Sequence, residues 1–236
     1  AIYFYLHFQY NAWFILALIG ILFYFLEKRG IFLEKKAFSR FFYLLNSGVI
    51  CTFFLSVLWV EPHWIFYAAA ALGAILQLMA FMDFFGMLQP LWKNILPVFS
   101  PYVNFLLKAA AVLLMVKILL QLFSAHPYFA ELAFTYTDFV IGYLHWVFLG
   151  LVTLTLFALL EMAGLLRVSK IALWIYLTGF ILSEALIFYK GTSIWLGLPF
   201  FSEYFKVLVA VSSLLPLSVG IILFRNLLTN SKSSPN

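Results

Sequence analysis

Seven long apolar stretches, separated by short connections that contain charges, proline or glycine, constrain the fold of this 236-residue chain. A membrane hydrocarbon core about 30 Å thick is crossed by roughly 20 residues of α-helix, because each residue rises about 1.5 Å. Transmembrane β-strands instead alternate in polarity over about 10 residues. A chain in lipid must satisfy its backbone groups internally, so we predict an all-α polytopic transmembrane helical bundle. The predicted helices cover residues 5–26, 41–60, 64–88, 102–124, 135–160, 170–189 and 205–225.

Composition supports a membrane protein and excludes several other classes. The sequence is 66% hydrophobic and 10% charged, with a mean hydropathy of +1.07, whereas soluble domains are roughly half apolar and a quarter charged. Cys51 is the single cysteine, so it cannot form an intrachain disulfide. The net charge of +5 is spread between the apolar stretches, so we expect a lipid bilayer and no nucleic acid as partner. Residues 1–228 are expected to form one transmembrane domain, followed by a polar tail at residues 229–236.

The distribution of lysine and arginine predicts the orientation of the chain. If the seven helices alternate in direction, ten of the fourteen basic residues fall on one side, two on the other and two inside the fourth helix. Cytoplasmic loops are enriched in Lys and Arg, so the N-terminus is predicted outside and the C-terminus in the cytoplasm. The ten are Lys28, Arg29, Lys35, Lys36, Arg40, Lys93, Arg167, Lys170, Arg225 and Lys232; the opposite side has Lys190 and Lys206, and the fourth helix contains Lys108 and Lys117.

His145 is the histidine predicted to lie deepest in the membrane, about 15 Å into the fifth helix. Gly142 and Asp138 share its helical face at three- and four-residue spacing. An imidazole is a common axial ligand of haem iron, and a glycine one turn away permits close approach of a flat macrocycle. The face therefore predicts a haem site at His145 and Gly142. The alternative is that His145 bonds to a neighbouring helix and Gly142 permits close helix packing.

His7 and Asn11 form a second polar group at the start of the first helix, where they lie one turn apart on the same face. His7 is the second candidate for a haem ligand. The alternative is that these residues are interfacial, since polar and aromatic side chains are favoured at the level of the lipid headgroups.

Lys117 and Glu184 are predicted at the same depth, because each lies about fifteen residues into a helix that runs in the same direction. A charge at the bilayer centre costs roughly 2.5 to 3.5 kcal/mol, so we expect the two to pair, with Gln121 one turn beyond the lysine. The pair would serve either to hold the helices together or to relay protons or ions. In the second case Asp138 and His145 would be outer steps of the route.

Two short stretches resemble motifs of a known family. Residues 5–14, YLHFQYNAWF, and residues 142–150, GYLHWVFLG, resemble motifs in bacterial integral membrane proteins that look like distant relatives of haem-copper oxidase subunit I. The second also resembles the oxidase helix in which a haem-ligating histidine precedes a glycine by several residues. The resemblance implies haem binding through His145 and, second, through His7, an oxidase-like role in electron transfer, and a multi-pass location in the bacterial inner (cytoplasmic) membrane.

The chain departs from the oxidase pattern at the copper site. It has no His-Pro-x-x-x-Tyr, no adjacent pair of histidines and no His-x-His within a predicted helix. The usual copper site therefore cannot be assembled from this chain alone. The sequence enters an apolar stretch directly at Ala1, and we expect either a processed start or a C-terminal portion of a longer protein that supplies further ligands.

Three functions are compatible with these features. The first is a haem-binding, redox-linked, oxidase-like subunit. The second is a proton or small-solute transporter that uses Lys117 and Glu184, and the third is a non-catalytic scaffold that packs against other membrane subunits. The sequence has no zinc-ligand spacing, phosphate loop or nucleophile motif that would identify catalytic residues.

Overall fold

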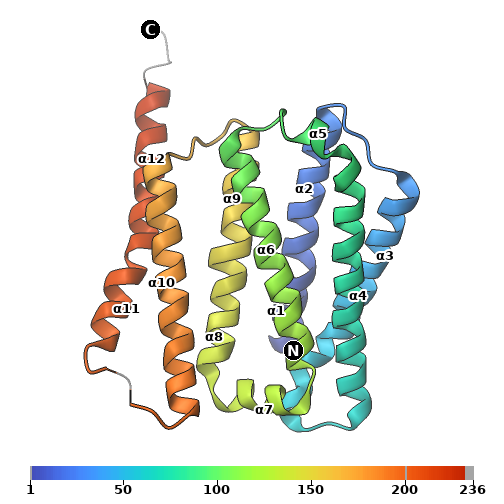
Figure 1. Cartoon of the computed structure of the whole chain (residues 1–236), viewed down its shortest axis with the longest axis vertical. Coiled ribbons are helices and arrows are strands. Elements are labelled where there is room, and N and C mark those ends of the chain that lie inside the picture. The colour runs from blue at the N-terminus through green and yellow to red at the C-terminus, as the bar shows by residue number, and fades with distance from the viewer. Residues whose placement is uncertain (1, 200, 232–236) are drawn as a thin grey trace.

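The computed structural model describes residues 2–199 and 201–231 as a bundle of helices, with no β-strand in these ranges (Figure 1). Seven helical segments of the described chain are long and apolar enough to cross a membrane. They are Ile2–Lys28, Lys35–Val60, Trp64–Ile95, Pro101–Ser124, Thr137–Met162, Lys170–Trp195 and Tyr204–Leu228. The predicted all-α transmembrane architecture is therefore confirmed, and the chain has the structure of a multi-pass integral membrane protein.

Most of the seven spans are built from more than one helical element. The first three consist of α1 (Ile2–His7), η1 (Phe8–Trp13) and α2 (Phe14–Lys28); α3 (Lys35–Thr52) and η2 (Phe53–Val60); and α4 (Trp64–Leu88), η3 (Gln89–Leu91) and α5 (Trp92–Ile95). The others are α6 (Pro101–Ser124); α8 (Thr137–His145), η4 (Trp146–Val152) and α9 (Thr153–Met162); α10 (Lys170–Trp195); and α11 (Tyr204–Ser212) with α12 (Leu214–Ser231). The elements η1 and η4 are π-helical, and η2 and η3 are 3-10 helices.

The structure differs from the prediction at two connections. The segment between the fourth and fifth spans, predicted only as a connection, contains α7 (Pro127–Thr135). His126 caps this helix, since its Nδ1 accepts a hydrogen bond from the backbone N–H of Tyr128 at 3.3 Å, and Pro127 occupies the first turn, where its missing N–H costs nothing. At the other end of the chain, α12 continues to Ser231, three residues into the expected tail. Residues 232–236 lie outside the described part.

The two ends of the described chain lie at opposite ends of the bundle, as an odd number of spans requires (Figure 1). The connection from α2 to α3, the segment around α5 and the connection from α9 to α10 lie at the end where α12 finishes, and these carry most of the lysines and arginines assigned to one side. We call this the basic end. That the basic end faces the cytoplasm stays a prediction.

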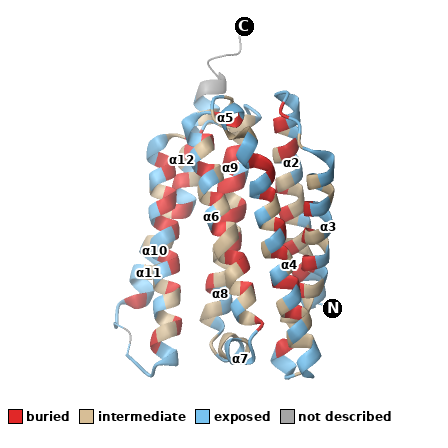
Figure 2. Ribbon diagram, turned by 45° about the vertical axis from the view of Figure 1, so that its right-hand side comes forward, coloured by how far each residue is buried: buried red, intermediate tan, exposed pale blue. Residues whose placement is uncertain are grey.

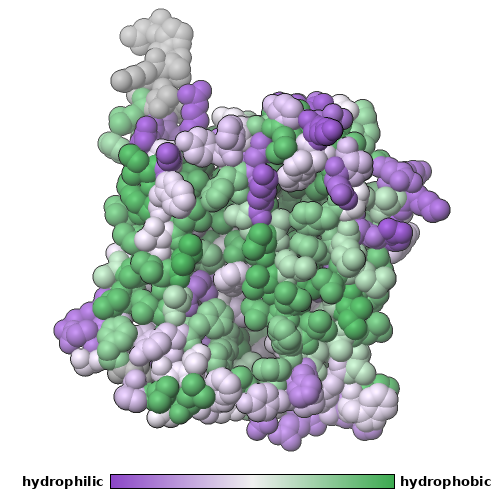
Figure 3. Space-filling model, in the orientation of Figure 1, coloured by the Kyte–Doolittle hydropathy of each residue, from purple (hydrophilic) through white to green (hydrophobic). Residues whose placement is uncertain are grey.

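On the face shown in Figure 3, a broad apolar band lies between two more hydrophilic ends. Large side chains of the spans, such as Tyr24, Trp174 and Phe224, are exposed, and much of the helix surface between the ends is open rather than packed against protein (Figure 2). A water-soluble monomer does not expose apolar surface on this scale. The band is therefore the surface that contacts the lipid bilayer.

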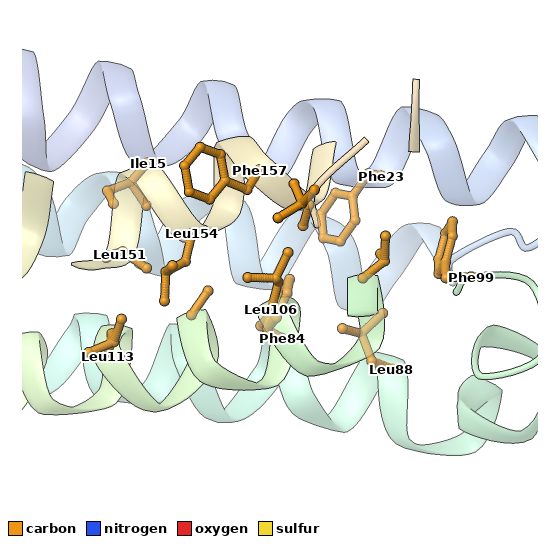
Figure 4. Packing of buried hydrophobic residues seen from close by; sticks show 14 of the residues in the cluster. Ile15, Phe23, Phe84, Leu88, Phe99, Leu106, Leu113, Leu151, Leu154 and Phe157 are labelled. Atoms are coloured by element: carbon orange, nitrogen blue, oxygen red, sulfur yellow. The ribbon is translucent and has the colours of Figure 1, made fainter. Parts of the chain in front are cut away.

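The largest cluster of buried apolar side chains lies mainly toward the basic end. Figure 4 shows Leu106 and Leu113 of α6 packed with Leu151, Leu154 and Phe157 of the fifth span and with side chains of α2 and α4. Since α6 begins at the basic end, its first turns supply apolar contacts and its last turns supply the polar residues described below. The core therefore leaves the other half of the bundle for a polar site.

The helices α3 and α4 approach each other closely at two glycines. A Cβ on Gly73 would lie 2.5 Å from the backbone N of Thr52, and a Cβ on Gly48 would lie 2.9 Å from the carbonyl O of Gly73. Small residues at such crossings allow backbones to touch, which is how many membrane helices associate. Nearer the basic end, the guanidinium of Arg40 binds both carboxylate oxygens of Asp83. These contacts fix the register of α3 on α4.

Candidate functional site

Six buried polar side chains form a continuous hydrogen-bonded network in the half of the bundle away from the basic end. Each is at most 4% exposed, and they come from the first four spans. The set, which we call the Lys117 network, is His7, Asn11, Thr52, Gln77, Lys117 and Gln121. Polar side chains are costly to bury inside a membrane and usually mark functional sites. The clustering of these six residues is therefore the strongest functional signal in the molecule.

Lys117 is the centre of the network and is 1% exposed. Its Nζ donates to Oε1 of Gln121 at 2.8 Å, one turn further along α6, and to Oε1 of Gln77 on α4 at 3.2 Å. In the described part of the chain no carboxylate lies within 4 Å of this nitrogen. The ammonium is therefore held by neutral amide oxygens alone.

Two branches lead from the glutamines and meet at the backbone of α3. On one, Nε2 of Gln77 donates to Oγ1 of Thr52 at 2.8 Å, and this hydroxyl donates to the carbonyl of Val49 at 3.1 Å. On the other, Nε2 of Gln121 donates to Oδ1 of Asn11 at 3.4 Å, and Nδ2 of Asn11 donates to Nδ1 of His7 at 3.2 Å. Nε2 of His7 then lies 2.9 Å from the same carbonyl of Val49. The network is a closed ring.

The network uses both nitrogens of the His7 imidazole. Nδ1 accepts from Asn11, so Nε2 carries the proton and donates to Val49, an assignment that follows from the hydrogen bonds. The expected pairing of His7 with Asn11 on one face is therefore present. The expected role of His7 as a haem ligand is not supported by this geometry, because both imidazole nitrogens are already hydrogen-bonded and neither is left for iron.

A π-helical turn presents Asn11 to the network. The element η1 (Phe8–Trp13) begins immediately after His7. A π-turn inserts an extra residue into an α-helix and is frequently found at functional sites. The other π-helical turn, η4, likewise begins directly after His145. Both polar groups singled out in the sequence therefore adjoin an irregular turn of helix.

A small cavity lies beside the network. Its volume is about 20 Å³, and its polar lining consists of Asn11, Gln77 and Lys117. One water molecule needs roughly 10 to 15 Å³ of such space and two to four polar partners. The cavity therefore has the size and the polar groups to bind a single water next to the lysine.

Glu184 pairs with His145 and not with Lys117, so the expected ion pair of Lys117 and Glu184 is wrong. Oε1 of Glu184 lies 3.6 Å from Nδ1 of His145 across the interface of α8 and α10. The fifth span separates the two charges: the indole of Trp146 donates to the carbonyl of Leu113 on α6 at 3.0 Å and packs on Phe180 of α10. Equal depth on two parallel helices did not bring the residues together, because another helix lies between them.

The pair of His145 and Glu184 is unusual in its surroundings. The carboxylate is 5% exposed, whereas the imidazole is 42% exposed. Their separation of 3.6 Å is too long for a hydrogen bond, and neither oxygen of Glu184 nor Nδ1 of His145 makes one with the described residues. Buried polar groups of this kind are rare in folded proteins and call for a specific explanation, such as a functional role.

Gly142 and Asp138 have other contacts than those expected. A Cβ on Gly142 would lie 2.9 Å from the ring of Phe188, so this ring fills the space proposed for a macrocycle. The alternative expectation, that Gly142 permits close packing of helices, agrees with the structure. Asp138 accepts a bond from Nζ of Lys190 at 2.9 Å, which ties α8 to α10 near their ends.

Gln77 and Thr52 are the residues of the site that the sequence analysis missed. Both lie inside apolar spans, and Gln77 in particular is an amide near the middle of the third span, so the rule that polar residues at depth are functional would have selected it. Their partner, Lys117, was recognised. The missing information was which helices adjoin α6.

Neither a metal-ligand cluster nor a related protein identifies the function of the Lys117 network. Among the residues that the structure describes, no three of His, Cys, Asp and Glu come together as metal ligands, although a haem held by one axial histidine needs no such cluster. Comparison with known proteins finds no matching family, curated protein or solved structure.

Proposed function

We propose that this chain is a proton transporter of the bacterial inner membrane, and that Lys117 is the group that takes up and releases the proton. The observation that supports this is a lysine at 1% exposure whose partners are two glutamine oxygens. A lysine that served only to hold helices together would be expected to pair with a carboxylate, which would offset much of the cost of burying the charge. Glu184, the expected partner, lies beside His145 instead.

The neutral partners of Lys117 suit a group that changes its charge. The oxygens of Gln77 and Gln121 accept a hydrogen bond from an amine as well as from an ammonium, so the network persists when the proton leaves. A carboxylate partner would instead be left as an unpaired buried charge, which is strongly destabilising. The water-sized cavity beside Lys117 offers a place for the group that delivers or accepts the proton.

Replacing Lys117 by glutamine is expected to abolish proton uptake. The measurement uses purified protein in lipid vesicles that contain a trapped pH-sensitive dye, with an interior-negative potassium diffusion potential as driving force. Wild-type protein should acidify the vesicles faster than protein-free vesicles do, and Lys117→Gln should not. The matched control is Lys206→Gln, which removes an exposed lysine that pairs with Glu203 and should transport like wild type.

Two results would contradict this proposal. One is wild-type uptake no faster than in protein-free vesicles; the other is equal uptake by wild type and Lys117→Gln. Lys117→Met serves as a second variant, and elution of each variant at the wild-type volume from a sizing column establishes that it folds.

A haem-binding, redox-linked role at His145 is the second candidate, and it is favoured by a different observation. Histidines that bind metals usually direct their other ring nitrogen toward a carboxylate or carbonyl, and Nδ1 of His145 faces Glu184 while the ring is 42% exposed. Nε2 would then hold the iron, and haem would supply one-electron chemistry. Since Phe188 fills the space at Gly142, the residues that would hold such a haem are His145 and, behind it, Glu184, without Gly142.

The absorption spectrum tests the haem candidate directly. Protein purified from haem-supplemented cells is expected to show a haem band that is lost in His145→Ala, shifted in Glu184→Gln and retained in His7→Ala. A spectrum without the band in wild type, or a band that is unchanged in His145→Ala, would exclude His145 as a ligand.

A further inference from the structure

A large apolar cavity occupies the half of the bundle toward the basic end. Its volume is about 550 Å³, within the range of small-molecule sites, whereas packed protein interiors contain few voids larger than a water. Helices α2, α4 and α6 supply most of its walls, and polar side chains are few: Asn104, Lys108 and Thr155. The hydroxyl of Thr155 already donates to the carbonyl of Leu151. The cavity is therefore suited to a hydrocarbon chain.

The cavity opens toward lipid between α4 and α6. Val112 lines it and is 63% exposed, and Phe85 on the facing helix is also exposed. From Asn104 to Val116 the lining of α6 extends over thirteen residues, or about 18 Å. This is about half of a hydrocarbon core roughly 30 Å thick, which is the depth of one leaflet. An acyl chain of a membrane lipid therefore has both the access and the length to fill it.

Two polar side chains of the cavity, Asn104 and Lys108, lie toward the basic end of the bundle. Nζ of Lys108 lies 5.5 Å from the centre of the Trp92 ring, and both residues line the cavity. Lys93 is adjacent to Trp92 and is exposed. Toward the opposite end, the cavity is lined by apolar side chains, including Ile15 and Leu114, that also line the small cavity beside the Lys117 network. A lipid in this cavity would therefore have its headgroup at Lys108 and its chain end at these apolar side chains.

We propose that the cavity is a binding site for one anionic phospholipid from the leaflet on the basic side, with one acyl chain between α4 and α6 and the phosphate at Lys108. The charge of the rim selects this occupant: Lys108 lies at the mouth, and the neighbouring connections are rich in Lys and Arg. Basic pockets at the ends of transmembrane helices bind anionic headgroups in this way. The proposal does not depend on proton transport.

Native mass spectrometry of the whole protein in mild detergent tests the site, with phosphatidylglycerol and phosphatidylcholine of identical chains as probes. Wild type is expected to retain one phosphatidylglycerol and to bind phosphatidylcholine more weakly. Lys108→Gln should weaken phosphatidylglycerol binding about fivefold, which corresponds to about 1 kcal/mol for one cation. Lys170→Gln, an exposed lysine at the same end that does not line the cavity, is the matched control and should bind like wild type.

A cavity-filling variant tests the position of the chain. Ala111 lines the cavity, and Ala111→Phe should reduce the binding of both lipids. The proposal is overturned if wild type binds the two lipids equally, if Lys108→Gln binds phosphatidylglycerol as tightly as Lys170→Gln, or if a folded Ala111→Phe variant keeps its lipid. A neutral lipid-soluble compound as the sole bound species would also overturn it. Lys108→Gln keeps the site testable if Ala111→Phe fails to fold.

Discussion

Replacing Gly73 by valine is expected to lower the free energy of unfolding by about 3 kcal/mol or more, because there is no space for any side chain at this position. A Cβ on Gly73 would lie 2.5 Å from the backbone N of Thr52 and 2.8 Å from the carbonyl carbon of Cys51. Backbone atoms cannot rotate away as a side chain can, so α3 must move from α4. This movement would also separate Gln77 from Thr52, whose hydrogen bond is 2.8 Å long.

Gly86→Val is the matched control for this prediction. Gly86 is also a residue of α4, and a Cβ there would meet nothing within 4 Å. Both variants add the same side chain to the same helix, so their difference isolates the contact with α3. Titration of the helical circular dichroism signal with a denaturing detergent should unfold Gly73→Val first, and Gly86→Val close to wild type. Equal midpoints for the two variants would show that α3 and α4 are not held together at Gly73.

The spans could be predicted from the sequence because they depend on a one-dimensional property. A stretch of about 20 apolar residues must form a membrane helix wherever its neighbours lie, since its backbone groups have no other partners in lipid. The predicted start of the sixth helix at residue 170 agrees with Lys170–Trp195, and the predicted helix at 102–124 agrees with Pro101–Ser124. The π-helical turns were not predicted, because they are fixed by contacts between helices and not by hydropathy.

The polar residues of the site could be selected from the sequence, but their partners could not. Lys117 and Gln121 were recognised as polar groups at depth, and His7 with Asn11 as a polar pair one turn apart at the start of the first helix. The contact of Gln121 with Asn11 joins residues 110 positions apart. Depth in the membrane follows from counting residues, whereas the order of helices around the bundle does not.

The position of the fifth span explains why Glu184 does not pair with Lys117. Counting residues gave Lys117 and Glu184 the same depth, and the cost of an isolated charge favoured their pairing. Trp146 instead bridges the two helices that carry them: Lys117 binds Gln77 and Gln121, and Glu184 faces His145. The sequence therefore identified two charges that need partners, and the structure divides them between two separate sites.

Replacing Glu184 by methionine is expected to stabilise the protein by about 1 to 3 kcal/mol, the usual cost of leaving a buried polar group without a hydrogen bond. Both carboxylate oxygens of Glu184 lack a hydrogen bond to the described residues, and the side chain is 5% exposed. Methionine is unbranched and of similar size, so it can fill the same space without polar atoms. The measurement is the apparent melting temperature in detergent, which should rise.

Asp138→Asn, on the same interface, is expected to change stability in the opposite direction. Asp138 accepts a bond from Lys190 at 2.9 Å, so the substitution removes the charge of a satisfied pair and should lower the melting temperature. If Glu184→Met is destabilising as well, the carboxylate is a structural partner of His145 and is explained by folding alone. If the melting temperature rises for Glu184→Met and falls for Asp138→Asn, the carboxylate of Glu184 lowers the stability of the bundle. We then expect Glu184 to have a functional role, because stabilising substitutions typically cost activity where function needs a destabilised site.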